Sequence, residues 1–179
     1  MTRTTHALPG GLTFVLEPTR DFPPPLQKQA IALTAMVFPG EASLEGKFYY
    51  DSEPAQVAYA LDGDTLVALR PLERRKIEVA GHTLDIAGGI IPTVHPDYRR
   101  RGIASAMVEV LLQAFTAQNI DYSLAFLFDG APEWFLSPLD YKKLENTFFY
   151  TDNTTGEERE ETARAYGRAI RTLEPDVEA

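Results

Sequence analysis

Three arginines followed by a glycine, Arg99-Arg100-Arg101-Gly102, have the residue types and the setting of an anion-binding loop. After them, apolar residues recur with the spacing of one buried helix face, at Ile103, Met107, Val110, Leu111 and Ala114. The first amides of a helix lack partners and carry the positive end of the helix dipole, so they favour an anion. Gly102 lets the backbone approach a ligand closely, and Ala104 leaves the start of the helix unobstructed. The loop is therefore a candidate site for phosphate or pyrophosphate, with a solvated basic turn as the alternative.

Two apolar runs flank this loop and its helix. Residues 86–94 are too few to span a membrane but suit a buried strand, and residues 122–128 suit a second one. Because a helix separates the two runs, we expect them to lie parallel through a crossover. Pro92 cannot donate to a sheet ladder, so we expect a bulge or a parting of strands near it. An edge strand is the alternative, which the apolar flanks disfavour.

The segment around the arginines resembles the R/Q-x-x-G-x-G/A signature of the GNAT superfamily of acyl-CoA-dependent N-acyltransferases. The matching residues are Arg99-Arg100-Arg101-Gly102-Ile103-Ala104, preceded by Val94-His95-Pro96-Asp97-Tyr98. In that family the loop binds the pyrophosphate of acetyl-CoA. The resemblance implies this role for the backbone amides of Arg100, Arg101, Gly102, Ile103, Ala104 and Ser105, with Arg99 adding positive charge. It also implies that the main chain at Val94 pairs with the pantetheine arm like an added strand.

The GNAT resemblance implies an α/β fold, in which helices flank a mixed central sheet with an antiparallel N-terminal meander and a splayed parallel pair of strands. Turn signals at Asp62-Gly63-Asp64 and Ala80-Gly81 independently predict the meander. The remaining patterns predict strands at 11–17, 56–61, 65–69, 74–79, 82–86 and 143–150, and helices at 26–37 and 155–173. Thr155 and Glu158 have capping-box spacing at the start of the last helix, whose narrow apolar stripe could cover the domain or a second subunit of a homodimer.

Length and composition indicate one globular domain. The chain has 179 residues, of which 44% are hydrophobic and 24% charged, and no cysteine. We expect residues 1–83 to form the acceptor side, 84–150 the acetyl-CoA-binding core and 154–173 a C-terminal helix. No stretch has the character of a signal peptide or a membrane span, so a cytoplasmic protein without a membrane partner is expected.

The net charge of −9 indicates which partners the protein prefers. A negative surface repels nucleic acid, so none is expected as a partner. The same surface attracts a cationic amine, although an acidic surface that serves solubility is an alternative explanation.

Acyl transfer from a thioester also needs a proton donor and a base. Many GNAT members protonate the thiolate with a tyrosine in a segment similar to F-Y-x-x-L-G-F. Here that tyrosine falls on Leu136, or on Phe135 if one residue is inserted, and neither can donate a proton. A thiol with a pKa near ~8.5 leaves readily, so a missing acid should slow the step more than abolish it. We interpret Tyr141, which aligns with the aromatic residue ending that segment, as a packing residue.

Asp129, at the end of the second apolar run, is the first candidate for the base, followed by Glu133, Asp85 and Glu78. An aspartate before a glycine also forms turns, which is the alternative for Asp129. His95, directly before Pro96, is expected to shape the loop by hydrogen bonding. No histidine and carboxylate cluster has metal-ligand spacing, so no metal is expected.

These observations predict an N-acetyltransferase that moves the acetyl group of acetyl-CoA to a primary amine of a small molecule or a peptide, the small molecule being the first choice. The amine is expected to attack directly in a ternary complex. The alternative is a CoA-binding module with little or no transferase activity, serving as a sensor or an assembly partner. The missing tyrosine favours this alternative.

Overall fold

The computed structural model describes residues 3–50, 53–79, 81–90, 92–127, 136–145, 149–151, 155–160 and 164–171. The strands are β1 (Thr4–Ala7), β2 (Thr13–Pro18), β3 (Gln56–Asp62), β4 (Thr65–Val79), β5 (His82–Ile90), β6 (Thr93–Val94), β7 (Tyr122–Leu127), β8 (Lys142–Lys143), β9 (Phe149–Thr151), β10 (Glu158–Glu160) and β11 (Arg164–Ala169). The α-helices are α1 (Pro24–Val37) and α2 (Ile103–Ala117), and short 3-10 turns lie at Pro9–Gly11, Thr19–Asp21, Ala42–Leu44, Pro96–Tyr98 and Ser137–Leu139.

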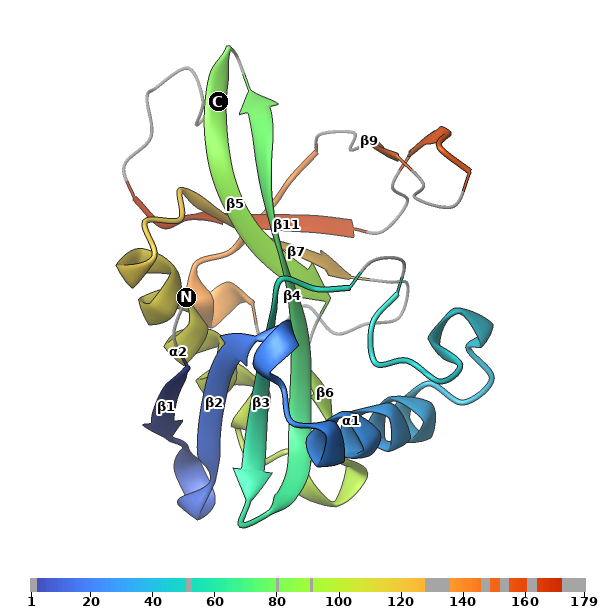
Figure 1. The fold of residues 1–179 in the computed structure, drawn as a ribbon. Helices are drawn as coiled ribbons and strands as arrows, with labels where there is room; N and C mark the ends of the chain where they lie inside the picture. The colour runs from blue at the N-terminus through green and yellow to red at the C-terminus, as the bar shows by residue number, and fades with distance from the viewer. Residues whose placement is uncertain are drawn as a thin grey trace.

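One long sheet organises these elements, in the order β1-β2-β3-β4-β5-β7-β11-β8 (Figure 1). Its pairs are antiparallel except β5 and β7, which are parallel and joined through α2. β6 pairs with β4 beside this path, and β9 and β10 form a separate hairpin. The predicted α/β fold, with its N-terminal meander and one parallel strand pair, is confirmed.

The two helices cover opposite faces of the sheet. Alternate residues of a strand point to opposite sides, so Val15 joins the core beneath α1 whereas Leu16 joins the core beneath α2. α1 begins at Pro24, where a missing N–H costs nothing because the first amides of a helix have no partner. α2 buries Ile103, Met107, Val108, Leu111, Leu112 and Phe115. Within the described residues, neither helix is of a length and hydropathy that would let it cross a membrane.

The two strands expected at 65–69 and 74–79 are one continuous strand, β4. Pro71 lies between the two expected strands, and proline removes a donor from the ladder. In the structure Pro71 lies between the stretch of β4 that pairs with β6, at Ala68 and Leu69, and the stretch that pairs with β5, from Glu73 onwards. Proline is tolerated there because one edge of β4 has no regular ladder at that point.

The closing helix predicted at 155–173 is wrong. Residues Arg164–Ala169 form β11, which is hydrogen-bonded to β7 on one edge and to β8 on the other. Thr155 makes a local turn instead of a helix cap, because its hydroxyl accepts from the amide of Glu157 (3.3 Å). The helix-forming residues of this segment were outweighed by pairing with two strands far away in the sequence. The strand expected at 143–150 is likewise two short pieces, β8 and β9.

Gly88 fits where no other residue would fit without a backbone shift. A Cβ atom at this position of β5 would overlap the carbonyl oxygen of Leu124 on the parallel strand β7. We expect Gly88→Ala to destabilise the fold by about 2 kcal/mol or more, because strands in contact cannot separate locally without losing pairing. Urea unfolding measures the change. In the comparison variant Gly167→Ala the obstacle is the ring of Tyr122, a side chain that can rotate, so a smaller loss is expected. Equal losses in both variants would contradict this explanation.

Candidate functional site

In the described part of the chain, β6 is not paired with β7 beyond the parallel strand pair, and we call this unpaired interval the gap. β5 and β7 are paired from Ile86 to Ile90, and the chain then leaves β7 to form β6 against β4. The pairing register with β4 shifts by one residue between β5 and β6, so a bulge lies between Gly88 and Thr93, the interval that contains Pro92. The interruption predicted at this proline is therefore confirmed. Among the described residues, the edge of β6 opposite β4 has no strand beside it.

The main chain of Val94 points its polar atoms toward that open edge. The amide of His95 donates to the carbonyl of Val67 (2.9 Å), which makes Val94 and Ala68 a pair without mutual hydrogen bonds. The N–H and C=O of Val94 consequently face away from β4. The guanidinium of Arg99 donates through Nε to the Val94 carbonyl (3.1 Å), so an exposed side chain covers this acceptor. An extended ligand could pair with Val94 as an added strand.

The loop before α2 presents a row of free amides. Arg100 and Gly102 both have positive φ values, 61° and 75°, which turn the chain sharply into the helix. The first helical bond runs from the amide of Ala106 to the carbonyl of Gly102 (3.0 Å). Among the described residues, no protein group accepts a hydrogen bond from the amides between Arg100 and Ser105. Their direction at a helix start, and the exposure of Gly102, suit a phosphate group.

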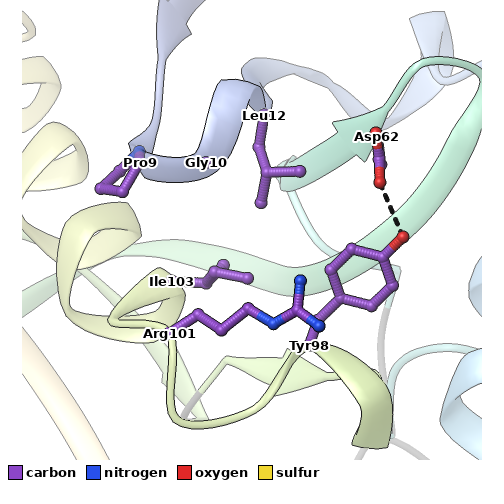
Figure 2. A pocket seen from close by; sticks show the side chains of 7 residues that line it. All are labelled: Pro9, Gly10, Leu12, Asp62, Tyr98, Arg101 and Ile103. Carbon is purple, nitrogen blue, oxygen red and sulfur yellow. Dashed lines mark hydrogen bonds between the residues drawn. The ribbon is translucent and has the colours of Figure 1, made fainter.

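The side chain of Arg101 stiffens the loop from outside. Arg101 donates to the carbonyl of Asp97 (2.6 Å), and its guanidinium lies over the ring of Tyr98, 4.9 Å from the ring centre. The Tyr98 hydroxyl donates to Asp62 at the β3–β4 turn (2.7 Å), and this hydrogen bond raises the pKa of Tyr98. Figure 2 shows these side chains around a small cavity of about 70 Å³. The loop is thus anchored to the meander while its amides stay free.

The structure describes two of the four carboxylates that were proposed as a base. Asp129 and Glu133 lie outside the described residues. Asp85 is bound to Arg74, and Glu78 accepts from the hydroxyl of Thr83 (2.5 Å) near the far end of the β4–β5 hairpin. Neither of these two is placed as a free base beside the gap. In the described part of the chain, no group of three or more His, Asp or Glu side chains could hold a metal ion.

His95 shapes the turn between β6 and α2. Its Nδ1 accepts from the amide of Asp97 (3.3 Å), and its ring meets the Tyr98 ring edge to face, with 5.8 Å between centres. This is the role expected for a histidine directly before a proline.

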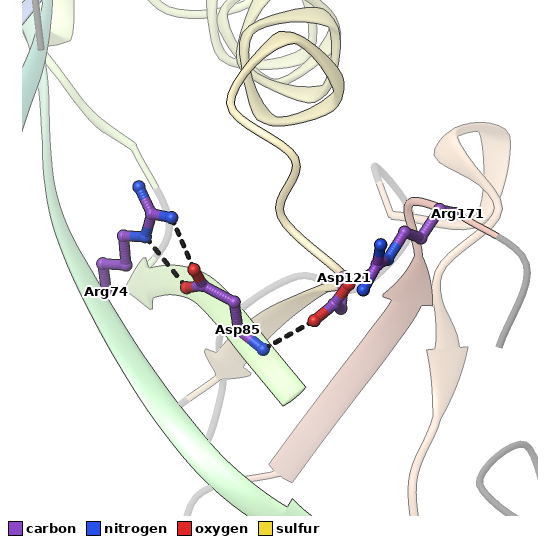
Figure 3. Close-up of polar contacts among 4 residues, drawn as sticks. All are labelled: Arg74, Asp85, Asp121 and Arg171. Carbon is purple, nitrogen blue, oxygen red and sulfur yellow. Dashed lines mark hydrogen bonds and ion pairs between the residues drawn. The ribbon is translucent and has the colours of Figure 1, made fainter. Parts of the chain in front are cut away.

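Asp85 belongs to a cluster of charges that links β4 and β5 to the chain just before β7 and just after β11 (Figure 3). Arg74 on β4 donates to both carboxylate oxygens of Asp85 on β5, at 2.8 and 2.5 Å. The buried Asp121 accepts from the amide of Asp85 (2.8 Å) and is also paired with Arg171 after β11. The hydrogen bond from Arg74 holds the pKa of Asp85 below its usual value. This is a structural clamp, which explains why Asp85 is not a base.

We expect Asp85→Asn to destabilise the protein by about 1.5 kcal/mol at pH 7, because a hydrogen bond between two charged groups is lost. Because the pKa of Asp85 is lower in the folded than in the unfolded protein, its ionised carboxylate stabilises the fold at pH values above the unfolded pKa of 3.8. This stabilisation is lost as the pH falls through the folded-state pKa. The difference between variant and wild type should therefore shrink at pH 3. Urea unfolding at both pH values tests this, with Glu78→Gln as the control. A difference that stays the same at pH 3 would contradict the assignment.

Leu136, at the position of the family tyrosine, is 2% exposed and packs in the core beneath α2. Phe135, the alternative position, lies outside the described residues. Tyr141 is buried in the same core, and its hydroxyl shares a hydrogen bond with the hydroxyl of Ser123 on β7 (2.6 Å). Its interpretation as a packing residue is consistent with this burial, although the hydroxyl also has polar partners.

Two charged residues near the gap were missed by the sequence reasoning. Arg70 is 2% exposed on β4, and it is the only charge in the apolar run 65–72, a signal that could have revealed it. Glu73 lies opposite Gly88 and is the carboxylate of β4 nearer to the gap. Its side chain is 38% exposed, and Arg75 lies 3.4 Å away. Nothing in the local sequence distinguishes Glu73 from the other charges that follow it.

Three solved structures with a similar fold are N-acetyltransferases. The ribosomal-protein-S18-alanine N-acetyltransferase of Escherichia coli is 16% identical, with 98% of each chain covered and a TM-score of 0.53. An aminoglycoside 6'-N-acetyltransferase complexed with coenzyme A is 14% identical over 89% of this chain and 98% of that one, with a TM-score of 0.60. Arabidopsis thaliana Naa50, in complex with a CoA bisubstrate analogue, is 15% identical over 87% and 97%, with a TM-score of 0.56. At these identities the similarity is one of fold.

The family is identified by a match to a protein-family model. A comparison with curated proteins finds no match. The model described as acetyltransferase (GNAT) domain matches residues 26–132, which include most of α1, the strands β3 to β7 and the loop before α2. The gap beside β6 and the free amides of the loop fit the slender arm and the pyrophosphate of acetyl-CoA, the family's co-substrate. The chain therefore belongs to the GNAT family of acetyl-CoA-dependent N-acetyltransferases.

Proposed function

We propose that this protein transfers the acetyl group of acetyl-CoA to a primary amine of a small cationic molecule, while both substrates are bound. One observation carries the proposal: the unpaired amides from Arg100 to Ser105 lie next to the open edge of β6 at Val94. Pyrophosphate at the loop and pantetheine along β6 would direct the thioester to the bulge at Pro92. The acceptor would approach the thioester there.

Positioning is the main contribution expected from the chain. Holding an amine against a thioester replaces a bimolecular encounter and can lower the barrier by up to ~7–11 kcal/mol in well-oriented cases. A backbone N–H of the central strand could polarise the thioester carbonyl. A carboxylate near the gap can take the proton from the amine, a role for which we propose Asp129, with Glu73 as the second candidate.

A cationic acceptor is supported by the distribution of charge. Beside the net charge of −9, the segment between α1 and β3 carries Glu41, Glu45 and Glu53. The β9–β10 hairpin and its flank carry Glu157, Glu158 and Glu160, which are exposed. In Figure 1 both segments extend to the right of the sheet. Acidic groups there would attract an amine that carries further positive charges.

Calorimetric titration with acetyl-CoA and with CoA, followed by release of free thiol across an amine panel, tests the proposal. We expect binding of both ligands and thiol release with polycationic amines such as polyamines or aminoglycosides. Release with neutral or anionic amines alone would contradict the cationic acceptor. Binding without release for any amine would favour the CoA-binding module, for which the buried Leu136 at the tyrosine position is the supporting observation.

A further inference from the structure

Arg99 is an exposed arginine whose side chain lies against the outer edge of β6. Its Nε donates to the carbonyl oxygen of Val94, 3.1 Å away. Val94 and Ala68 form a pair without mutual hydrogen bonds, so this carbonyl points away from β4. The guanidinium of Arg99 therefore stands on the side of β6 where an added strand would pair.

The distance from Nε to the carbonyl oxygen decides what this contact excludes. In a sheet, an amide nitrogen lies about 2.9–3.0 Å from the carbonyl oxygen that accepts its hydrogen bond. The Nε of Arg99 lies at nearly the same distance from Val94, 3.1 Å, and on the outer side of the strand. An N–H of a ligand and the guanidinium cannot both occupy that position. Pairing of an extended ligand with the carbonyl of Val94 therefore requires Arg99 to leave.

The contact is weak enough to be exchanged for a better one. Arg99 is exposed and water competes for both groups, so the hydrogen bond favours this position of the side chain by roughly tenfold. A diphosphate offers the guanidinium several charged oxygens that match its paired N–H groups, whereas the carbonyl offers one neutral oxygen. The loop amides of Arg100 to Ser105, the candidates for holding a diphosphate, follow Arg99 directly in the chain. A diphosphate bound by these amides would lie beside the backbone of Arg99.

We propose that Arg99 moves between the carbonyl of Val94 and the diphosphate of CoA, and so couples the binding of the two halves of this ligand. The inference rests on the proposed function. Without a nucleotide, the guanidinium occupies the pairing position on β6 and opposes the pantetheine arm. The diphosphate draws the guanidinium away, and the carbonyl of Val94 can then accept from a pantetheine amide. Each half of CoA favours the position of Arg99 that the other half needs, which is positive coupling.

This coupling would give Arg99 a role in specificity. A thioester of pantetheine alone has no diphosphate with which to move the guanidinium, so it meets the covered carbonyl of Val94. Its apparent affinity is reduced to the fraction of molecules in which the carbonyl is free. The chain would therefore prefer complete acetyl-CoA to shorter thioesters by more than the direct contacts of the nucleotide provide.

The two halves of CoA should respond in opposite directions when the Arg99 side chain is shortened and made neutral. In Arg99→Met we expect ADP, which carries the diphosphate, to lose about three- to tenfold in affinity, because one charged partner is removed. Neutral pantetheine, which carries the arm without phosphates, should gain about three- to tenfold, because the carbonyl of Val94 is always free. NMR titrations that follow the amide signals of β6 and of the loop measure both affinities.

Arg101→Met is the matched control, since it removes the same charge from the same loop. Arg101 donates to the carbonyl of Asp97 (2.6 Å) instead of Val94. We expect weaker binding of ADP and unchanged binding of pantetheine in this variant. An equal gain for pantetheine in Arg101→Met would show that the lost charge, and not the release of Val94, is the cause. That result would overturn the inference.

The remaining outcomes separate the inference from simpler roles of Arg99. If Arg99 only binds phosphate, the affinity for pantetheine is unchanged in Arg99→Met. If Arg99 only supports the loop, both ligands lose affinity and the melting temperature falls. Either result overturns the inference, as do an unchanged affinity for ADP and pantetheine binding that stays undetectable in Arg99→Met. The proposed function survives these results as long as wild type binds CoA, whereas failure of wild type to bind CoA overturns both.

Discussion

Replacing Gly102 by glutamate is expected to weaken CoA binding by at least about 100-fold, or about 2.7 kcal/mol, while the fold is retained. The new carboxylate would stand where the pyrophosphate approaches the amides of Arg100 to Ser105, and like charges repel at short range. A Cβ at Gly102 meets no atom within 4 Å, so the added side chain has room in the folded protein. Its φ of 75° adds a local strain of about 1–2 kcal/mol, which a domain of this size tolerates. Calorimetric titration and thermal unfolding measure the two effects separately.

Gly102→Asn is the matched control. Asparagine accepts the left-handed conformation more readily than glutamate and carries no charge. We therefore expect Gly102→Asn to keep most of the CoA affinity at a similar cost in stability. If asparagine and glutamate weaken binding equally, bulk or strain is responsible and the amides are not shown to hold an anion. If neither weakens it, the pyrophosphate site lies elsewhere.

Replacing Val94 by proline is expected to reduce CoA affinity by at least about 30-fold, or about 2 kcal/mol, with little change in stability. The N–H of Val94 faces the open edge of β6 and makes no bond to β4. Proline removes this donor and places its ring where the pantetheine arm would pair. Edge positions tolerate proline because no internal ladder bond is lost. The same calorimetric and unfolding measurements report both quantities.

Thr93→Pro gives the opposite pattern and serves as the control for Val94→Pro. Because Val94 and Ala68 do not exchange hydrogen bonds, the next pair, Thr93 and Leu69, exchanges them by alternation. Proline at Thr93 should therefore lower stability by about 1–3 kcal/mol through the lost bond to β4. A destabilised Val94→Pro with normal affinity for CoA would show that pantetheine does not run along β6.

The features that local signals determine were predictable from the sequence. Gly102 and the helical periodicity after it mark a turn into a helix within a few residues, and that helix is α2. Pro92 lacks a donor wherever it lies, so a disturbance of the ladder followed from the residue type alone. Asp62-Gly63-Asp64 sets a tight turn, and it joins β3 to β4. In each case the determining interaction is close in the sequence.

The features that depend on distant partners were not predictable. Residues 164–169 carry helix formers, and only pairing with β7 and β8 makes them a strand. Gly167 is an example of this dependence on a distant residue, because its lack of a side chain leaves room for the ring of Tyr122 on the neighbouring strand β7. Arg70 could be noticed in the sequence as a lone charge, but its place behind the bulge follows from the register of three strands.

The position of β11 in the sheet has a consequence for synthesis on the ribosome. β7 is made well before β11, yet β11 occupies the edge of β7 that faces away from β5. Until Arg164–Ala169 emerges from the exit tunnel, the nascent domain carries an unsatisfied strand edge next to its only parallel pair among the described strands. Such edges recruit other chains, and the danger is greatest while neighbouring polysomes hold similar intermediates. Slow translation of the segment between β7 and β11 would therefore favour aggregation of the unfinished protein, whereas early chaperone capture of β7 would prevent it.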